Sequence, residues 1–179
     1  MTLGEFETFL TLNKTKGEFN MVNKKTRYIT HAAIIAALYV VLTHISTIMG
    51  LSSGAIQIRF SEALTVLAAL TPAAIPGLFI GCFISNIFAG CVFWDIVFGS
   101  LATLLGALGT YCLRKHIYLS PLPPIVSNTV IIPFVLKLAY GLPESVWYFA
   151  LTIGIGEIVS CGVLGLLLIS ALKKTKINL

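Results

Sequence analysis

Long apolar stretches alternate with short segments of proline, glycine and charged residues from residue 28 onward. A helix needs about 20 apolar residues to cross the hydrocarbon core of a bilayer. The lengths of these stretches therefore predict an all-α membrane protein with six transmembrane helices. We expect the helices at residues 28–49, 56–70, 77–89, 95–113, 121–140 and 145–172.

Prolines divide the longest uncharged run of the chain into two short helices. Residues 63–94 carry no formal charge, and this run is too long for one comfortable crossing. Pro72 and Pro76 lie within it, and a proline either breaks a helix or begins one. We therefore expect a turn at residues 71–76 between the second and third helices.

The composition agrees with a lipid environment for most of the chain. Of the 179 residues, 57% are hydrophobic and only 11% are charged, whereas a soluble domain carries roughly a quarter charged residues. A water-soluble core cannot hide so much apolar surface. The composition therefore excludes a soluble enzyme, a nucleic-acid-binding protein and a secreted disulfide scaffold.

Basic residues cluster at places that the six-helix prediction puts on one side of the membrane. We expect residues 1–27 to form a disordered cytoplasmic tail, residues 28–172 the transmembrane domain, and residues 173–179 a basic cytoplasmic C-terminus. Cytoplasmic segments of membrane proteins carry an excess of lysine and arginine. The outer side then holds Arg59 and Lys137, and the cytoplasmic side holds Lys14, Lys16, Lys24, Lys25, Arg27, Arg114, Lys115, Lys173, Lys174 and Lys176.

The sequence lacks the short motifs that carry catalysis, metal binding or ATP binding. It has no phosphate-binding Gly-x-x-x-x-Gly-Lys-Ser/Thr motif, and its three histidines have no partner at helical spacing. Its four cysteines lack Cys-x-x-Cys spacing and are expected to be free thiols. We therefore predict no enzyme, no cofactor and no metal site, and we expect another subunit to energise any transport.

Few polar side chains fall within the predicted helices, where lipid makes them costly. A charged residue at the centre of a span costs about 2.5–3.5 kcal/mol on insertion scales, so it needs a partner or a cavity. Glu157 lies near the middle of the last helix, too deep to reach the surface. The others lie in the outer half, which indicates a ligand pocket open to the outside: Gln57, Arg59, Glu62, Asn86, Asp95 and Lys137.

Each of these residues also has a purely structural explanation. Arg59 and Glu62 are three residues apart and can pair with each other. Asp95 suits a helix start, and Lys137 can extend to the membrane surface. Glu157 can be protonated, paired across helices or placed at the floor of a wet pocket. Aromatic residues at the helix ends fit an interfacial belt as well as a stacking role: Trp94, Tyr140, Trp147 and Tyr148.

Small residues recur four positions apart on the first and third predicted helices, a spacing that lets helices approach closely. Gly77 and Gly81 fit packing within the chain. The first helix carries two alanine pairs that can instead face another membrane protein: Ala32 with Ala36, and Ala33 with Ala37.

Several linked motifs resemble the QueT family. Residues 57–67 read Gln-Ile-Arg-Phe-Ser-Glu-Ala-Leu-Thr-Val-Leu, and residues 70–77 read Leu-Thr-Pro-Ala-Ala-Ile-Pro-Gly. Ile80-Gly-Cys82 and Asn86 follow, and residues 95–105 and 110–115 continue the likeness. The similarity covers about residues 25–172, which is nearly everything but the tail.

The resemblance implies the substrate-binding S component of an energy-coupling factor (ECF) transporter, a class of ABC importers in the bacterial plasma membrane. Such a component has six helices, binds its solute on the outer side and docks on the membrane coupling protein EcfT and two ABC ATPases. The small residues of the first helix are then the expected docking surface. The expected substrate is a deazaguanine precursor or salvage form of queuosine, such as queuine, queuosine or a biosynthetic base.

A deazaguanine suits the polar residues of the predicted pocket. Its N–H groups can donate to Glu62, Asp95 or Glu157, and its carbonyl can accept from Gln57, Arg59 or Asn86. Some precursors add an aminomethyl cation that a second carboxylate can meet. Many polar heterocycles satisfy the same groups, so an S component for another vitamin or nucleobase is an alternative. A membrane-embedded enzyme and a structural membrane protein are the other two.

Overall fold

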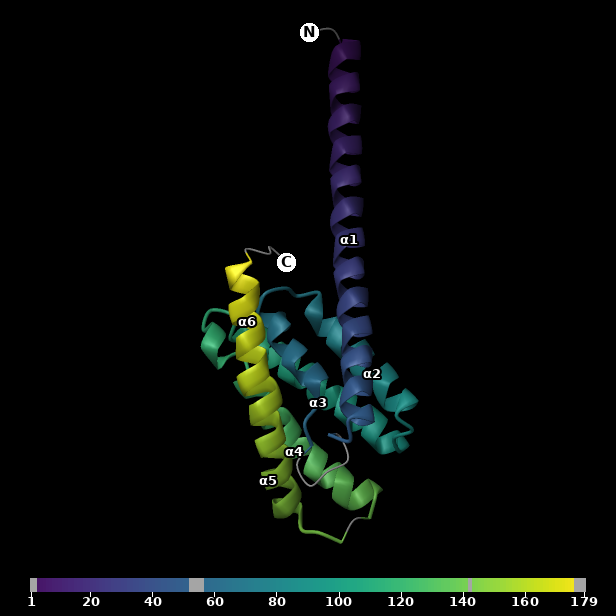
Figure 1. Cartoon of the computed structure of the whole chain (residues 1–179). Helices are drawn as coiled ribbons and strands as arrows, with labels where there is room; N and C mark the ends of the chain where they lie inside the picture. Colours follow the sequence, from purple (N-terminus) through teal and green to yellow (C-terminus); the bar gives the residue numbers. More distant parts are fainter. Residues whose placement is uncertain (1–2, 52–56, 142, 176–179) are drawn as a thin grey trace.

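The computed structural model describes residues 3–51, 57–141 and 143–175, with side chains from residue 23 onward. Within these residues every regular element is helical (Figure 1). The elements are α1 (Leu3–Ile48), the 3₁₀ helix η1 (Phe60–Ala69), α2 (Ala74–Phe88), α3 (Phe93–Cys112), the short 3₁₀ turn η2 (Ile117–Leu119), α4 (Leu122–Ala139), α5 (Val146–Glu157), the π-helical segment η3 (Ile158–Leu164) and α6 (Gly165–Lys174).

Four helical stretches are long and apolar enough to cross a membrane: Asn23–Ile48, Phe93–Cys112, Ile117–Ala139 and Val146–Lys174. The all-α architecture is therefore confirmed. The helices η1 and α2 are shorter, with 10 and 15 residues. At about 2.0 and 1.5 Å per residue they extend roughly 20 Å, less than the ~30 Å hydrocarbon core. Six crossings and cytoplasmic termini stay predictions.

The turn expected at residues 71–76 is present but shorter, because Pro72 precedes α2 whereas Pro76 lies in its first turn, where a proline is tolerated. The Ala74 amide donates to the Thr71 carbonyl (3.2 Å), and α2 begins at Ala74. At the start of α5, the Ser145 side chain accepts from the Tyr148 amide (3.2 Å), which satisfies one of the unpaired donors of the first helical turn. Proline and capping chemistry thus account for these boundaries.

The first helix is longer than the sequence predicts. In the structure α1 begins at Leu3, so the part of the expected disordered tail from residue 3 to residue 27 continues the helix. This stretch contains no proline and is rich in leucine, glutamate and lysine, which favour helix. Residues 1–2 and 176–179, including Lys176 of the expected basic C-terminus, lie outside the described residues.

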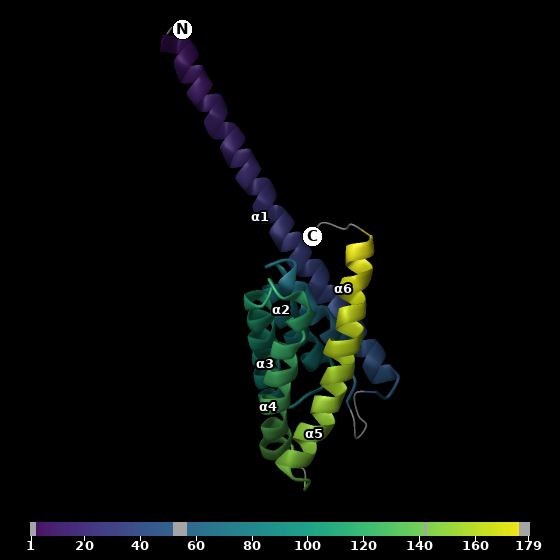
Figure 2. The same ribbon diagram turned by 90° about the vertical axis from the view of Figure 1, so that its left-hand side faces the viewer.

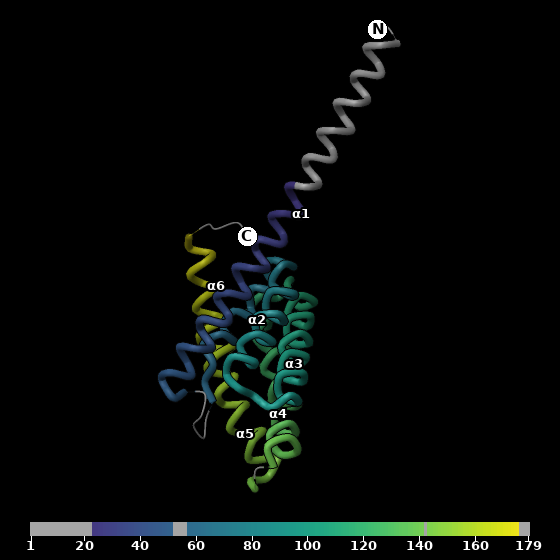
Figure 3. The backbone as a smooth tube through the Cα atoms, turned by 90° about the vertical axis from the view of Figure 1, so that its right-hand side faces the viewer, coloured from purple at the N-terminus to yellow at the C-terminus, as the bar shows by residue number. Residues whose placement is uncertain are grey.

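The long helices pack in chain order around η1. The helix pairs α1–α2, α2–α3, α3–α4 and α4–α5 are in contact, and Figure 2 shows α3 and α4 side by side along one flank. The elements α5, η3 and α6 form one continuous rod, seen at the opposite flank of the tube in Figure 3. η1 contacts α1, α3, η3 and α6, and its residues 61–68 are all buried. The centre of the bundle is therefore a short 3₁₀ helix.

Two sets of contacts define the opposite ends of the bundle. At one end the Tyr28 hydroxyl donates to the Pro72 carbonyl (3.3 Å), and the Lys173 ammonium lies 5.5 Å from the centre of the Tyr118 ring. At the other end the Val92 amide donates to the Tyr140 hydroxyl (3.3 Å). The described basic residues near the chain termini and in the connection between α3 and α4 thus share the first end.

The bundle is apolar outside, and its interior contains buried polar side chains beside apolar core clusters. Large apolar side chains on the outer faces of every long helix are exposed, such as Leu38, Leu105 and Phe134. Acidic and amide side chains are buried, including Glu62 (2% exposed) and Asn86 (2% exposed). An apolar surface of this extent is stable in lipid rather than in water, and the buried polar groups require partners or a ligand.

Candidate ligand-binding site

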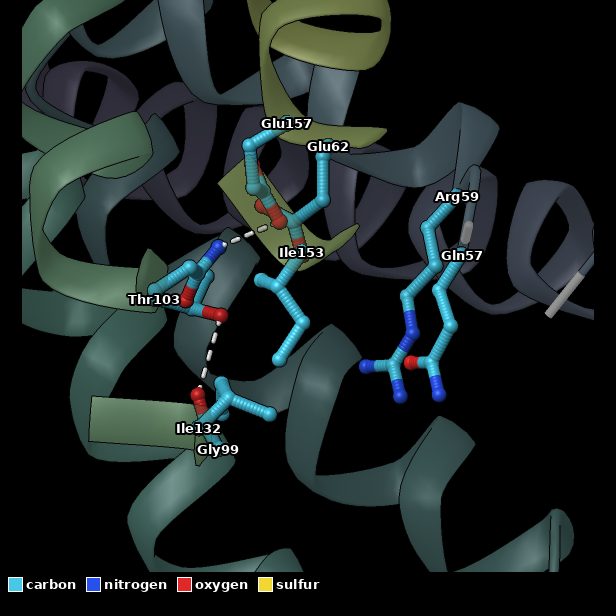
Figure 4. Close-up of a pocket in the computed structure, with 9 residues that line it drawn as sticks. Gln57, Arg59, Glu62, Gly99, Thr103, Ile132, Ile153 and Glu157 are labelled. Carbon is cyan, nitrogen blue, oxygen red and sulfur yellow. Dashed lines mark hydrogen bonds between the residues drawn. The ribbon is translucent and has the colours of Figure 1, made fainter. Parts of the chain in front are cut away.

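A narrow polar cavity lies inside the bundle between η1, α3, α4 and α5. Figure 4 shows the Glu62 and Glu157 carboxylates converging on one wall, while the Arg59 and Gln57 side chains run next to each other across from them. Apolar side chains and one backbone glycine complete the lining. The lining residues are Gln57, Arg59, Glu62, Gly99, Thr103, Asn128, Ile132, Ile153 and Glu157.

Gln57 and Arg59 enter the cavity from an extended segment that precedes η1. Arg59 has extended backbone angles (φ −110°, ψ 111°), although the sequence predicted helix from residue 56. The amide of Phe60 donates to the Ser46 hydroxyl on α1 (2.9 Å), which ties the end of this segment to the bundle. On its other side the Gln57 carbonyl lies against Gly156 of α5, so closely that a Cβ at residue 156 would overlap it. The segment is therefore held between α1 and α5.

Glu62 and Glu157 face each other, and most of their oxygens accept hydrogen bonds from neighbouring helices. The Tyr39 hydroxyl of α1 donates to Glu62 Oε1. The Asn128 amide of α4 donates to Glu157 Oε1 (2.9 Å), and the Cys161 thiol donates to Glu157 Oε2 (3.1 Å). Glu62 Oε2 is buried without a hydrogen-bond partner in the described part of the chain. The cavity therefore contains one open carboxylate oxygen.

The π-helical segment η3 begins immediately after Glu157 and places Cys161 beneath the carboxylates. The Cys161 sulfur lies 3.3 Å from the Glu62 carbonyl oxygen and 3.5 Å from the Thr65 hydroxyl. Single wide turns of this kind often mark functional positions in helices. Here the wide π-helical turn of η3 packs against η1, a 3₁₀ helix that is narrower than an α-helix.

A separate polar cluster of Asn86, Asp95 and Tyr140 lies beside the cavity, next to Gly99. A Cβ at residue 99 would come within 3.1 Å of Asn86 Nδ2 and 3.5 Å of Asp95 Oδ1. The Tyr140 hydroxyl donates to Asp95 Oδ2 (2.9 Å), so Asp95 bonds across to the end of α4 as well as beginning α3.

The sequence-predicted site residues divide into two groups. Gln57, Arg59, Glu62 and Glu157 line the cavity, and Asn86, Asp95 and Tyr140 form the adjoining polar group described above. The pairing of Arg59 with Glu62, which the sequence left open, is absent from the described residues; Glu62 bonds to Tyr39. Glu157 is paired across helices with Asn128, one of the arrangements the sequence left open.

Three predicted site residues lie away from the cavity. Trp94 is 54% exposed and stacks on Phe98 (ring centres 5.9 Å apart) along an outer groove. Trp147 is 85% exposed. The Lys137 ammonium donates to the carbonyls of Pro143 and Glu144 (both 3.1 Å) at the end of the bundle. The exposed positions of the two tryptophans fit the interfacial belt that was the alternative explanation. The lysine ties the end of α4 to the connection before α5.

Among the residues at the site that were missed from the sequence, three bond to the two glutamates. Asn128 and Cys161 had a usable signal, because one is an amide inside a predicted span and the other lies one helical turn after Glu157. Tyr39 looked like an ordinary tyrosine of the first span, and nothing local indicated that it would reach Glu62. Its role depends on how α1 packs on η1.

The two alanine pairs of α1 lie on different faces. Ala32 and Ala36 pack against α2, where Cβ atoms at residues 77 and 81 would lie 2.6 and 3.0 Å from their carbonyl oxygens. Ala33 and Ala37 are exposed. All four line a shallow groove between α1 and α2 together with Ile29, Val40, Ile80 and Ile84.

An apolar exterior around buried polar side chains and a polar cavity is typical of a helical membrane protein. Comparison with known families identifies the family of the chain. The chain belongs to the QueT transporter family, which it matches over residues 29–174. This family consists of transporters and not of enzymes, as the absence of catalytic motifs predicted.

One curated relative supports the family assignment. The chain is 41% identical over 85 residues to the queuosine precursor transporter QueT of Lactococcus lactis subsp. cremoris (strain MG1363). The match covers 48% of this chain and 50% of the relative, so it spans about half the length of each. No solved structure matches the chain.

Proposed function

We propose that this chain is the substrate-binding S component of an ECF-type ABC importer and that it captures a deazaguanine queuosine precursor at the outer side of the bacterial cell membrane. The observation that carries the proposal is the buried polar cavity inside an apolar bundle of a QueT family member. The name of the relative, a queuosine precursor transporter, supports the choice of substrate. Six crossings with both termini in the cytoplasm complete the proposal.

The cavity supplies the groups that a deazaguanine needs. Carboxylates of Glu62, Glu157 and Asp95 can accept from ring and amino N–H groups, and Arg59 and Gln57 can donate to the ring carbonyl. Ile132 and Ile153 offer apolar walls for the ring faces. The cavity is narrow, so entry of a bicyclic ring requires movement of the Arg59 and Gln57 side chains, which lie on the extended segment rather than on a helix.

Binding of a deazaguanine to the purified chain tests the substrate. We expect queuine, queuosine or a deazaguanine base to raise the melting temperature of the detergent-solubilised protein. A ligand at a hundred times its Kd stabilises a protein by about 2.7 kcal/mol, which corresponds to roughly 5–10 °C for a chain of this size. Thermal-shift assays and calorimetry measure the effect, with guanine and common vitamins as comparison ligands.

The outcome of this screen separates the alternatives. Stabilisation by a vitamin or ordinary nucleobase, and by no deazaguanine, would favour an S component for another solute. No stabilisation by any small molecule would contradict a binding function and favour a structural membrane protein.

The exposed alanines of α1 are the proposed docking surface for EcfT, which works with two ABC ATPases. Ala32 and Ala36 are occupied by packing against Gly77 and Gly81. Ala33 and Ala37 are exposed on the same helix, beside an apolar groove that can receive a helix of a membrane partner. The structure therefore favours Ala33 and Ala37 as the pair that meets the partner.

Replacement of Ala33 and Ala37 by leucine is expected to abolish uptake and leave ligand binding unchanged. Leucine side chains fill the groove and prevent close approach of a partner helix, while the cavity lies on the other side of α1. Uptake of labelled ligand by cells that contain the ATPase module, together with calorimetry on the purified chain, measures the two effects. Ala171→Leu, an exposed alanine of α6, is the matched control. Normal uptake by the double variant would refute this docking surface.

A further inference from the structure

The open oxygen of Glu62 lies beside a second carboxylate, and this pair is not satisfied by the chain alone. Glu62 is 2% exposed and Glu157 is 8% exposed. One carboxylate oxygen from each lies within 4.8 Å of the other, with the Cys161 sulfur equally near. Two buried carboxylates at this separation repel each other unless a proton or a cation lies between them. The pair is therefore stable only when a proton or a cation is bound to it.

The described residues place no cation in direct contact with this pair, although the positive charge of Arg59 acts on both carboxylates across the cavity. Arg59 is the one basic side chain that lines the cavity, and it makes no ion pair with either glutamate among the described residues. Figure 4 shows its guanidinium next to the Gln57 amide, across the cavity from the carboxylates. Tyr39, Asn128 and Cys161 donate uncharged hydrogen bonds to the two glutamates. A ligand can therefore supply a cation that contacts both carboxylates directly.

The geometry of the pair suits one nitrogen with several N–H donors. Charged N–H···O bonds are about 2.7–2.9 Å long, and the N–H bonds of an ammonium are roughly 110° apart, so one nitrogen bridges two oxygens about 4.6 Å apart. One oxygen of Glu62 and one of Glu157 lie within 4.8 Å of each other, which is compatible with this spacing. A ring edge with adjacent N–H groups suits both oxygens of one carboxylate instead. Glu62 offers one open oxygen only, because its other oxygen accepts from Tyr39.

We propose that Glu62 and Glu157 together bind a primary ammonium group of the transported ligand. The site then selects a deazaguanine that carries an aminomethyl cation over precursors of the same ring with an uncharged substituent. Asp95, behind Gly99, is left to meet the ring's N–H groups, and Arg59 and Gln57 its carbonyl. This inference rests on the proposed function and adds the charge of the substrate to it.

A comparison of three deazaguanines tests the inference on the purified full-length chain. The ligands are the aminomethyl form, the hydroxymethyl form, which is similar in shape but neutral, and the cyano form. Because a hydrogen bond to a charged group contributes more than a neutral one, we expect the aminomethyl form to bind at least about tenfold more tightly than either neutral form. Equal or tighter binding of a neutral form would overturn the inference.

Substitution of the glutamates tests whether Glu62 and Glu157 bind the charged aminomethyl group of the ligand. Glu62→Gln is expected to remove the preference, by weakening the aminomethyl form about tenfold and leaving the hydroxymethyl form unchanged. Persistent binding of the hydroxymethyl form shows that the variant is folded, and Glu157→Gln is a second variant with the same expectation. Glu144→Gln, at an exposed position, is the matched control and should keep the preference. Equal weakening of both ligands by Glu62→Gln would refute the assignment.

Two further outcomes are distinguishable. If none of the three deazaguanines binds, the proposed function fails as well as this inference. A metal ion is the other cation that two carboxylates and a thiol can hold. Titration of the chain with Zn²⁺ alone, and repetition of the ligand series in EDTA, separates the two. Loss of the aminomethyl preference in EDTA would show that a metal and not the ammonium occupies the pair.

Discussion

Replacing both Glu62 and Glu157 by glutamine is expected to weaken binding of the aminomethyl ligand strongly and leave the protein folded. Glutamine has nearly the shape of glutamate, so the packing of Tyr39 and Asn128 around the pair is kept. Each charged hydrogen bond to a ligand contributes about 1.5–3 kcal/mol, so the loss of two should weaken binding by a factor of about 100 or more.

The same double variant should melt at the same temperature as the parent protein or higher. Two close carboxylates in a buried site oppose folding, because each loses its hydration and meets a like charge. Calorimetry with the aminomethyl deazaguanine measures the affinity, and a thermal melt without ligand measures the stability. The variant Glu144→Gln should change neither. A double variant that binds normally would remove the carboxylate pair from the site, and one that melts much lower would mean that the pair is structural.

The fold was predictable because inserting a polar side chain into lipid costs much free energy, so membrane-spanning segments are recognisable from the residues they contain. Apolar length fixed the four long helical stretches, and Pro72 marked the turn before α2. The 3₁₀ form of η1 and the π-helical form of η3 were not predictable in the same way. These two segments lie against each other, and their shapes depend on contacts between residues about a hundred positions apart, such as Thr65 with Cys161 (3.5 Å).

The site was partly predictable for the same reason. A charged residue in an apolar stretch is conspicuous, so Arg59, Glu62 and Glu157 were found from the sequence. The position of a residue along a helix does not tell which side of the helix its side chain faces, and the predictions failed mostly for residues near helix ends. Trp147 and Lys137 lie at helix ends and do not line the cavity, whereas Tyr39 bonds to Glu62 from a helix expected to serve for docking.

Gly156 is expected to be the position where the smallest change has the largest effect on the site. Its backbone lies against the carbonyl of Gln57, and the ideal Cβ of an alanine would overlap that oxygen and lie 2.9 Å from the carbonyl carbon. Both partners are backbone, so neither can rotate away as a side chain would. Gly156→Ala must therefore move the extended segment off α5, and Arg59 moves with it.

We expect Gly156→Ala to weaken ligand binding by about tenfold or more, since overpacking costs about 1–3 kcal/mol and displaces the Arg59 donor. Alanine is the better helix former by about 1 kcal/mol, so helix propensity alone predicts the opposite sign for stability. Gly154→Ala is the matched control on the same helix, because its Cβ would meet only Thr129 side-chain atoms at an ordinary 3.5 Å. It should bind normally and melt no lower than the parent. Equal behaviour of the two variants in calorimetry would show that the contact between Gly156 and Gln57 does not position the site.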